Sequence, residues 1–102
     1  MKPLHLTEES FDKEARHASL PILIDFYADW CGPCRLVAPV IEEIAEEADG
    51  YLVGQVNVDE APGLAEEFSV MSIPTLIVLE GGKVKARAVG VRPKEAILAL
   101  LH

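Results

Sequence analysis

The sequence predicts an α/β domain in which a mixed sheet of about five strands is covered on both faces by about four helices. Three observations support this prediction. Half of the 102 residues are hydrophobic, which is enough for one core. Apolar runs with strand character alternate along the chain with segments of helical periodicity. Gly81 and Gly82 lie between the last two strand-like runs, as expected for a hairpin. The whole chain, residues 1–102, is therefore predicted to form a single domain.

The N-terminal quarter of the chain contains two predicted strands and a helix. Residues 3–6 (PLHL) are predicted to form a short edge strand. Thr7 then offers a suitable N-cap, which favours a helix over about residues 7–17. Residues 20–28 (LPILIDFYA) are an almost unbroken apolar run. Such a run is typical of a strand that is buried on both faces of a parallel sheet.

A long amphipathic helix is predicted over residues 32–50. Pro33 suits its first turn, and Gly50 can end it. One face is acidic and the other is apolar, the apolar positions being Val37, Val40, Ile41, Ile44 and Ala48. Pro39 lies inside the pattern, so we expect a kink there, because proline removes one backbone hydrogen bond and crowds the preceding turn.

In the second half of the chain, predicted strands and helices continue to alternate, except that the last two strands follow each other directly. Strands are predicted over residues 51–59, 73–80 and 83–90, and helices over residues 61–68 and 92–102. The inner face of the last helix is formed by Ile97, Leu100 and Leu101. The early alternation implies right-handed parallel crossovers, and the glycine hairpin adds an antiparallel edge strand.

Composition and charge exclude several classes of function. The formal net charge is −8, which argues against a nucleic-acid partner because phosphate binding needs the opposite sign. No apolar stretch approaches the ~20 residues that a membrane-spanning helix needs. The N-terminus shows no apolar signal-peptide core. We therefore expect no membrane association, a reducing cytoplasmic setting and, as the simplest state, a monomer.

The two cysteines, Cys31 and Cys34, are separated only by Gly32 and Pro33, where the predicted strand leads into the long helix. A bridge between them closes too small a loop to stabilise the fold much. The first amides of a helix carry partial positive charge, so the thiolate of Cys31 should be stabilised and its pKa lowered. Cys34, one turn further along, should be more shielded and less acidic. The pattern predicts disulfide exchange, in which Cys31 attacks a partner's disulfide and Cys34 resolves the mixed disulfide.

A zinc or iron–sulfur site is the alternative chemistry for a close cysteine pair. Such sites need four ligands, commonly a second CxxC motif or a histidine pair. His5, His17 and His102 are scattered and show no ligand spacing. We therefore expect no metal and no bound cofactor, the cysteine pair itself being the redox couple.

The sequence resembles the thioredoxin family over nearly its whole length, from about Leu4 to Leu101. The resemblance is carried by the motif WCGPC, preceded by DFYAD and followed in order by APVIEEIAEE, VNVDEAP, SIPT and VG. It implies a thioredoxin-like three-layer α/β/α fold and the activity of a dithiol reductant of protein disulfides. The implied partners are disulfide-containing substrate proteins and a thioredoxin reductase that supplies electrons.

The resemblance also implies roles at individual positions. Pro74 matches the family's cis-proline beside the cysteine loop, and the backbone of Ile73 is expected to pair with an extended substrate segment. Asp25 matches a buried aspartate behind Cys34, whose proton it would accept; burial should raise the pKa of Asp25. A flat apolar docking patch is implied for Trp30, Gly32, Pro33, Ile73, Pro74, Gly90 and Val91.

Three residues depart from the family pattern. Gln55 stands where a lysine is usual near the buried aspartate, so the pKa of Asp25 should rise further than in the usual member. Tyr27 replaces a frequent tryptophan, which should mainly alter packing. Met71 occupies a place beside the docking patch that is often basic, so partner choice should differ, including the reductase that recognises the protein.

Plainer interpretations remain open for several of these residues. Asp25 can be a strand residue that points to water, Trp30 a packing residue, Pro74 a trans proline at the start of an edge strand, and Gly90 a turn residue.

Two alternative functions also remain open: a disulfide oxidase or isomerase of the same fold, and a redox-silent protein-binding module. Proline next to Cys34 resembles the reductants, whereas histidine at that place is typical of isomerases.

Overall fold

The computed structural model describes residues 2–102, and its elements follow the predicted order. In chain order they are β1 (Leu4–Leu6), the π-helix η1 (Asp12–Arg16), β2 (Ile22–Tyr27), α1 (Gly32–Glu46), β3 (Leu52–Asn57), α2 (Pro62–Glu67), β4 (Thr75–Glu80), β5 (Lys83–Val89) and α3 (Lys94–Ala99).

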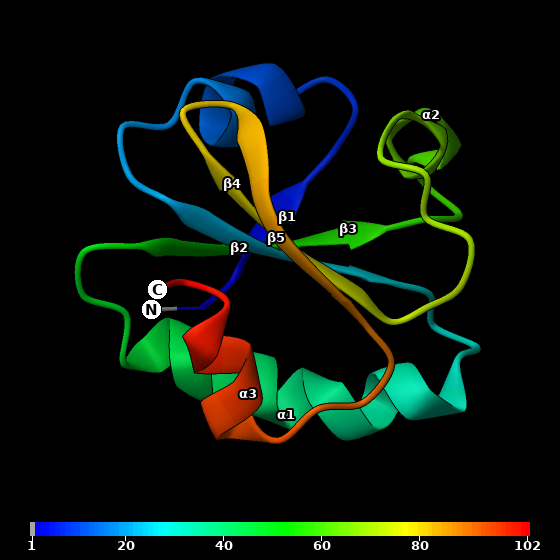
Figure 1. Ribbon diagram of the computed structural model, residues 1–102. Coiled ribbons are helices and arrows are strands. Elements are labelled where there is room, and N and C mark those ends of the chain that lie inside the picture. Colours follow the sequence, from blue (N-terminus) through cyan, green and yellow to red (C-terminus); the bar gives the residue numbers. More distant parts are fainter. Residues whose placement is uncertain (1) are drawn as a thin grey trace.

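The five strands form one mixed sheet in the order β1-β3-β2-β4-β5. Strands β1, β3 and β2 are parallel, whereas β4 runs antiparallel to β2 and β5 antiparallel to β4. Helices α1 and α3 cover one face of the sheet, and η1 and α2 cover the other (Figure 1). The predicted three-layer α/β/α fold with a mixed five-stranded sheet is thus confirmed.

The direction of β4 differs from the expectation that only the hairpin would add an antiparallel strand. Strand β4 is already antiparallel to its neighbour β2. The reason lies in α2, whose six residues span about 9 Å, about half the length of a six-residue strand. Helix α2 is therefore too short to carry the chain back across the sheet after β3. Strand β4 starts at the edge where β2 ends, and Thr75 pairs with Phe26.

Strand β2 is buried on both faces, as predicted, and its alternation assigns residues to the two layers. Ile22, Ile24 and Phe26 belong to the core beneath η1 and α2. Leu23 belongs to the core beneath α1 and α3. Because successive side chains point to opposite faces, Asp25 shares the α1 side with Leu23.

The helix predicted over residues 7–17 is shorter in the structure. Its predicted N-cap is present, because Thr7 Oγ1 accepts a hydrogen bond from the Ser10 N–H (3.1 Å). The regular part, however, is only the five-residue π-helix η1. Arg16 of η1 lies over two phenylalanine rings and pairs with Glu67 of α2. The local sequence does not predict these contacts of Arg16, which accompany the wider turn of the π-helix.

The remaining elements agree with the predicted segments and differ at their ends. Helix α1 is continuous through Pro39 and ends at Glu46, before Gly50; a kink at Pro39 stays a prediction. Gly81 and Gly82 make the hairpin turn with φ of +61° and +78°, a conformation that favours glycine. Over residues 2–102, no helix is both long enough and apolar enough to cross a membrane.

Candidate functional site

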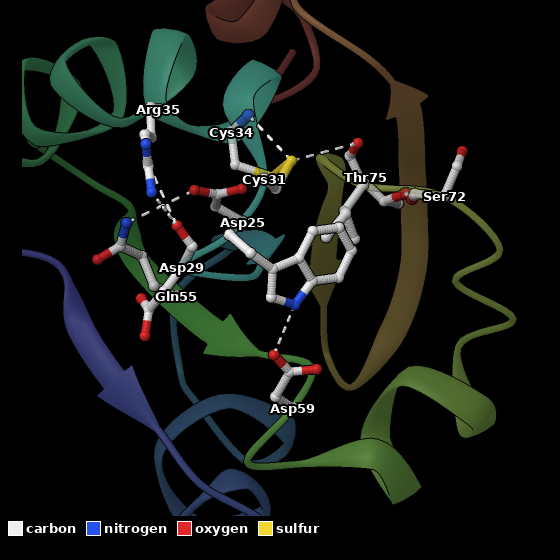
Figure 2. Close-up of a disulfide and its surroundings, with 11 residues drawn as sticks. Asp25, Asp29, Cys31, Cys34, Arg35, Gln55, Asp59, Ser72 and Thr75 are labelled. Carbon is white, nitrogen blue, oxygen red and sulfur yellow. Dashed lines mark hydrogen bonds between the residues drawn. A yellow bond between two sulfur atoms is a disulfide. The ribbon is translucent and has the colours of Figure 1, made fainter.

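The site forms where the end of β2, the start of α1 and the start of β4 meet. Strand β4 begins directly after the Ile73–Pro74 peptide bond, which is cis, as the family pattern implied. The reversal of β4 brings this bond to the sheet edge at which α1 starts. Figure 2 shows the cysteine pair at this junction, with Asp25 on one side and Thr75 on the other.

Cys31 and Cys34 are joined by a disulfide in the first turn of α1. Cys31 is the N-cap residue of this 15-residue helix, and its Sγ accepts a hydrogen bond from the Cys34 N–H (3.2 Å). The same Sγ lies 3.7 Å from the carbonyl oxygen of Ile73. A disulfide sulfur has no proton to donate, so this second approach is a contact that becomes a hydrogen bond only in the thiol form. The sulfur of Cys31 thus lies at the partially positive end of α1.

The two cysteines line different hollows. Cys31 lines an open groove of about 520 Å³, the cysteine groove, formed by Trp30, Cys31, Gly32, Pro33, Val58, Ala65, Val70, Met71, Ser72 and Ile73. Cys34 lines a smaller hollow of about 230 Å³, the aspartate cavity, formed by Asp25, Tyr27, Ala28, Asp29, Cys34, Arg35, Ala38 and Gln55. The exposed fractions of Cys31 and Cys34 are 5% and 3%. The expected difference in shielding is therefore small, and the residues differ more in the hollow that each faces.

Four residues of the predicted docking patch line the cysteine groove: Trp30, Gly32, Pro33 and Ile73. Pro74 is buried behind them, and its carbonyl oxygen accepts a hydrogen bond from the Gly90 N–H (2.8 Å). Val91 is 47% exposed and follows Gly90, outside the groove lining. Four of the seven predicted residues thus share the groove with Cys31, Pro74 and Gly90 lie behind it, and the docking role of Val91 stays a prediction.

Ser72, which belongs to the SIPT motif, also lines the groove but was not predicted as a site residue. Three further residues of the groove, Val58, Ala65 and Val70, were not predicted from the sequence either. They come from the end of β3, from α2 and from the loop before β4. No local motif marks them, because only the placement of α2 brings them to the groove. Met71 does have a sequence signal, its departure from the family pattern, and its side chain is 92% exposed.

Asp25 is buried, so the interpretation that it points to water is wrong. It is 1% exposed, and its Oδ1 has no hydrogen-bond partner within residues 2–102. Its Oδ2 accepts a long hydrogen bond of 3.5 Å from Gln55 Nε2, because the β2–β3 register places Gln55 opposite Asp25. Burial raises the pKa of Asp25 to about 6, and the hydrogen bond from Gln55 acts in the opposite direction.

Arg35 is another ionisable residue that lines the aspartate cavity. Arg35 donates two hydrogen bonds to the carbonyl oxygen of Asp29 (3.2 and 2.8 Å), so its guanidinium is tied to the backbone (Figure 2).

Within the part of the chain that the structure describes, no three histidine, cysteine, aspartate or glutamate side chains are clustered so as to hold a metal ion.

Comparison with known proteins places the chain among small redox proteins. A family model described as Thioredoxin matches residues 2–102. A Thioredoxin from Alicyclobacillus acidocaldarius subsp. acidocaldarius is 47% identical over 97 residues, which cover 94% of this chain and 91% of that protein. Thioredoxin 1 from Nostoc sp. is 43% identical over 98 residues, covering 95% and 92%. A Bifunctional thioredoxin reductase/thioredoxin from Mycobacterium leprae is 46% identical over 96 residues, covering 93% of this chain but 21% of that protein.

The contact between Gln55 and Asp25 predicts opposite effects for two substitutions. Gln55→Lys introduces a cation beside the carboxylate and should lower the pKa of Asp25, whereas Gln55→Met removes the hydrogen bond and should raise it. Titration of the Asp25 carboxyl by NMR, in the oxidised protein so that no thiol titrates, measures both effects. Identical titration curves in the three proteins would refute the influence of residue 55.

The burial of Asp25 predicts a pH-dependent gain in stability for Asp25→Asn. The pKa of about 6 in the folded protein exceeds the ordinary 3.8. The folded state therefore binds the proton more tightly, and stability is lost as the pH rises from about 4 through 6. At pH 8 the substitution should raise the free energy of unfolding by about 3 kcal/mol, at about 1.4 kcal/mol per pKa unit, and below pH 4 the gain should disappear.

Urea unfolding of the oxidised protein at several pH values measures this gain. Asp29→Asn, at an exposed carboxyl nearby, is the matched control and should show no comparable gain. A stability difference between wild type and Asp25→Asn that is the same at pH 3.5 and pH 8 would contradict the raised pKa.

Proposed function

The chain belongs to the thioredoxin family, and from this membership we propose that it acts in the cell as a general dithiol reductant of protein disulfides. Its activity is that of a thiol–disulfide oxidoreductase. The observation that carries the proposal is the Cys31–Cys34 disulfide at the N-terminus of α1, beside an open groove. In this role Cys31 is the nucleophile and Cys34 the resolving residue.

The reaction proceeds in two exchange steps. The thiolate of Cys31 attacks one sulfur of the partner's disulfide, so that a mixed disulfide forms and the other partner sulfur leaves as a thiolate. The thiolate of Cys34 then attacks the Cys31 sulfur, releases the second partner sulfur and closes the Cys31–Cys34 bridge. Two electrons and two protons pass in total from the protein dithiol to the partner, which becomes a dithiol.

The placement of Cys31 supports its role as the attacking group. The Cys34 N–H already points at its sulfur, and the amides at the start of α1 favour negative charge there. The groove that Cys31 lines admits a partner segment, whereas Cys34 does not line it. In the mixed disulfide the Cys34 sulfur lies one helical turn from the Cys31 sulfur, within reach of the second step.

The aspartate cavity supports a role for Asp25 in removing the proton from Cys34. Asp25 and Cys34 line it together, and a hollow of about 230 Å³ has room for several waters. With a pKa of about 6, Asp25 is mostly ionised at neutral pH and can accept a proton, directly or through water. Because this cavity is separate from the cysteine groove, a docked partner leaves the proton path open.

The electron donor in this proposal is a thioredoxin reductase, and the substrates are disulfide-containing proteins. The Mycobacterium leprae relative supports this pairing, because its printed name joins a thioredoxin reductase and a thioredoxin. Electrons pass through the cysteine pair alone, with no bound cofactor. We place the protein in the cytoplasm as a monomer, where such electron transport maintains thiol redox balance.

The alternative functions are not favoured. Pro33 next to Cys34 matches the reductants of the family rather than the isomerases. The cysteine pair forms a disulfide beside an open groove, which a redox-silent binding module does not need.

The proposal predicts distinct failures for the two cysteine variants in the reduction of insulin by dithiothreitol. Cys31→Ser removes the nucleophile and should lower the catalysed rate at least about a hundredfold. Cys34→Ser should also lose turnover and, when the reduced variant is mixed with insulin after dithiothreitol has been removed, accumulate a covalent complex with the partner, because no second thiol resolves the mixed disulfide. Mass spectrometry detects that complex. Full activity in Cys31→Ser, or a trapped complex at Cys34 in that variant, would end the proposed mechanism.

A further inference from the structure

Residues 58–73, which form one wall of the cysteine groove, include acidic side chains and neither lysine nor arginine, although Arg87 of β5 donates a hydrogen bond to the Phe68 carbonyl oxygen at the end of α2. Val58 lines the groove, and the two residues that follow it, Asp59 and Glu60, are exposed. Ala65 of α2 also lines the groove and is followed by the exposed Glu66. Between Arg35 and Lys83 the sequence contains ten acidic residues and neither lysine nor arginine. The chain from β3 through α2 to β4, which builds this wall, therefore supplies it with no cation.

Asp59 is held at the rim of the groove. Its Oδ2 accepts a hydrogen bond of 2.8 Å from the Trp30 Nε1–H, and Figure 2 shows the carboxylate of Asp59 at the end of this bond. The indole is a neutral donor, so it fixes the carboxylate without cancelling its charge. Trp30 itself lines the groove and is 68% exposed. The negative charge thus lies next to the surface on which a partner docks.

Glu60 adds to the same field. Its Oε1 lies 3.2 Å from His5 Nε2, but both side chains are more than half exposed, so water screens this pair. The charges of Asp29 and Glu60 add to burial in raising the pKa of the Tyr27 phenol, which lines the neighbouring aspartate cavity. Arg35, the cation nearest in sequence to the cysteines, is tied to the Asp29 carbonyl and lines the aspartate cavity instead.

The lining of the groove is apolar and, within residues 2–102, contains no charged side chain. Met71 is almost fully exposed at the edge of the groove, where its side chain adds apolar surface and no charge. The apolar groove lies beside the negative charges of Asp59 and Glu60, which are called the acidic rim. Together they are complementary to a segment that carries both apolar and cationic side chains. Such rim charges act mainly on the rate of encounter and on its dependence on salt.

We propose that this protein prefers disulfides whose cysteine lies in an apolar segment flanked by lysine or arginine, and that Met71 is a specificity-determining residue for this preference. The inference rests on the proposed reductant function and names its substrate class. The cationic flank lies over Asp59 and Glu60 while the apolar side chain enters the cysteine groove. A cation at position 71 would offset the rim charge and remove the preference.

Two synthetic cystine-linked peptide dimers test this proposal. They share one sequence with a leucine beside the cysteine and differ only in flanking residues, which are lysine in one and glutamate in the other. The rate of reduction by the reduced protein is divided by the rate with 2-mercaptoethanol, so that the intrinsic reactivity of each disulfide cancels. At about 10 mM ionic strength the lysine peptide should react about five- to tenfold faster, and at 0.5 M salt the ratio should fall below about twofold.

Three variants assign the preference to the rim. Met71→Lys should reduce the ratio to about twofold or less. Asp59→Asn keeps an oxygen that accepts the Trp30 N–H while losing the charge, and should about halve the ratio. Glu46→Gln makes the same charge change at the last residue of α1, about 20 Å along the helix from the cysteines. This matched control should keep the wild-type ratio.

Equal normalised rates for the two peptides at low ionic strength would overturn the proposal, as would a ratio that survives both Met71→Lys and Asp59→Asn. A ratio lowered as much by Glu46→Gln as by Asp59→Asn would also overturn it, since net charge rather than the rim would then be responsible. Failure to reduce either peptide, while 2-mercaptoethanol reduces both, would instead refute the reductant function, and the inference with it.

Discussion

The chemistry of the cysteine pair depends on how the first turn of α1 packs against the segment that leads into β4. There the sulfur of Cys31 lies 3.2 Å from the Cys34 amide nitrogen and 3.7 Å from the Ile73 carbonyl oxygen. The amide stabilises negative charge on that sulfur, and the carbonyl comes from the segment that leads into the cis-proline. The contact with Ile73 would not exist if β4 ran parallel to β2, because Ile73 and Pro74 would then lie at the opposite edge of the sheet. The short helix α2 is therefore part of the site, although only Ala65 of its six residues lines the groove.

The same framework separates two tasks in space. The alternation of β2 directs Asp25 toward α1, where it shares the aspartate cavity with Cys34. The cysteine groove is built instead by the loops around Cys31, by α2 and by the segment before β4. In the proposed mechanism, attack on a partner and removal of the Cys34 proton thus take place in different hollows. The arrangement has a stability cost, since within residues 2–102 the ionised carboxylate of Asp25, at 1% exposure, receives only one long hydrogen bond, from Gln55.

The elements that depend on local patterns were predictable, and those that depend on tertiary placement were not. The apolar run over residues 20–28 predicted β2 and the burial of Asp25, because a charged residue inside such a run has both faces covered. Pro33 predicted the start of α1. The direction of β4 was not foreseen, since helical periodicity does not show whether a helix is long enough to recross the sheet. The π-helical turn at Arg16 depends on contacts with Phe68 and Glu67, which are distant in sequence. For the same reason Val58, Ala65 and Val70 were missed in the groove, whereas Met71 and Gln55 were noticed as departures from the family pattern.

The central claim is that position at the mouth of α1 makes Cys31, rather than Cys34, the reactive thiolate. Alkylation of the reduced protein with iodoacetamide over a range of pH, followed by peptide mapping, tests it most directly. We expect Cys31 to be labelled first, with a midpoint clearly below the ordinary thiol pKa of about 8.5, while Cys34 takes up little label at neutral pH. Equal labelling of the two residues, or a Cys31 midpoint at or above the ordinary value, would contradict the claim.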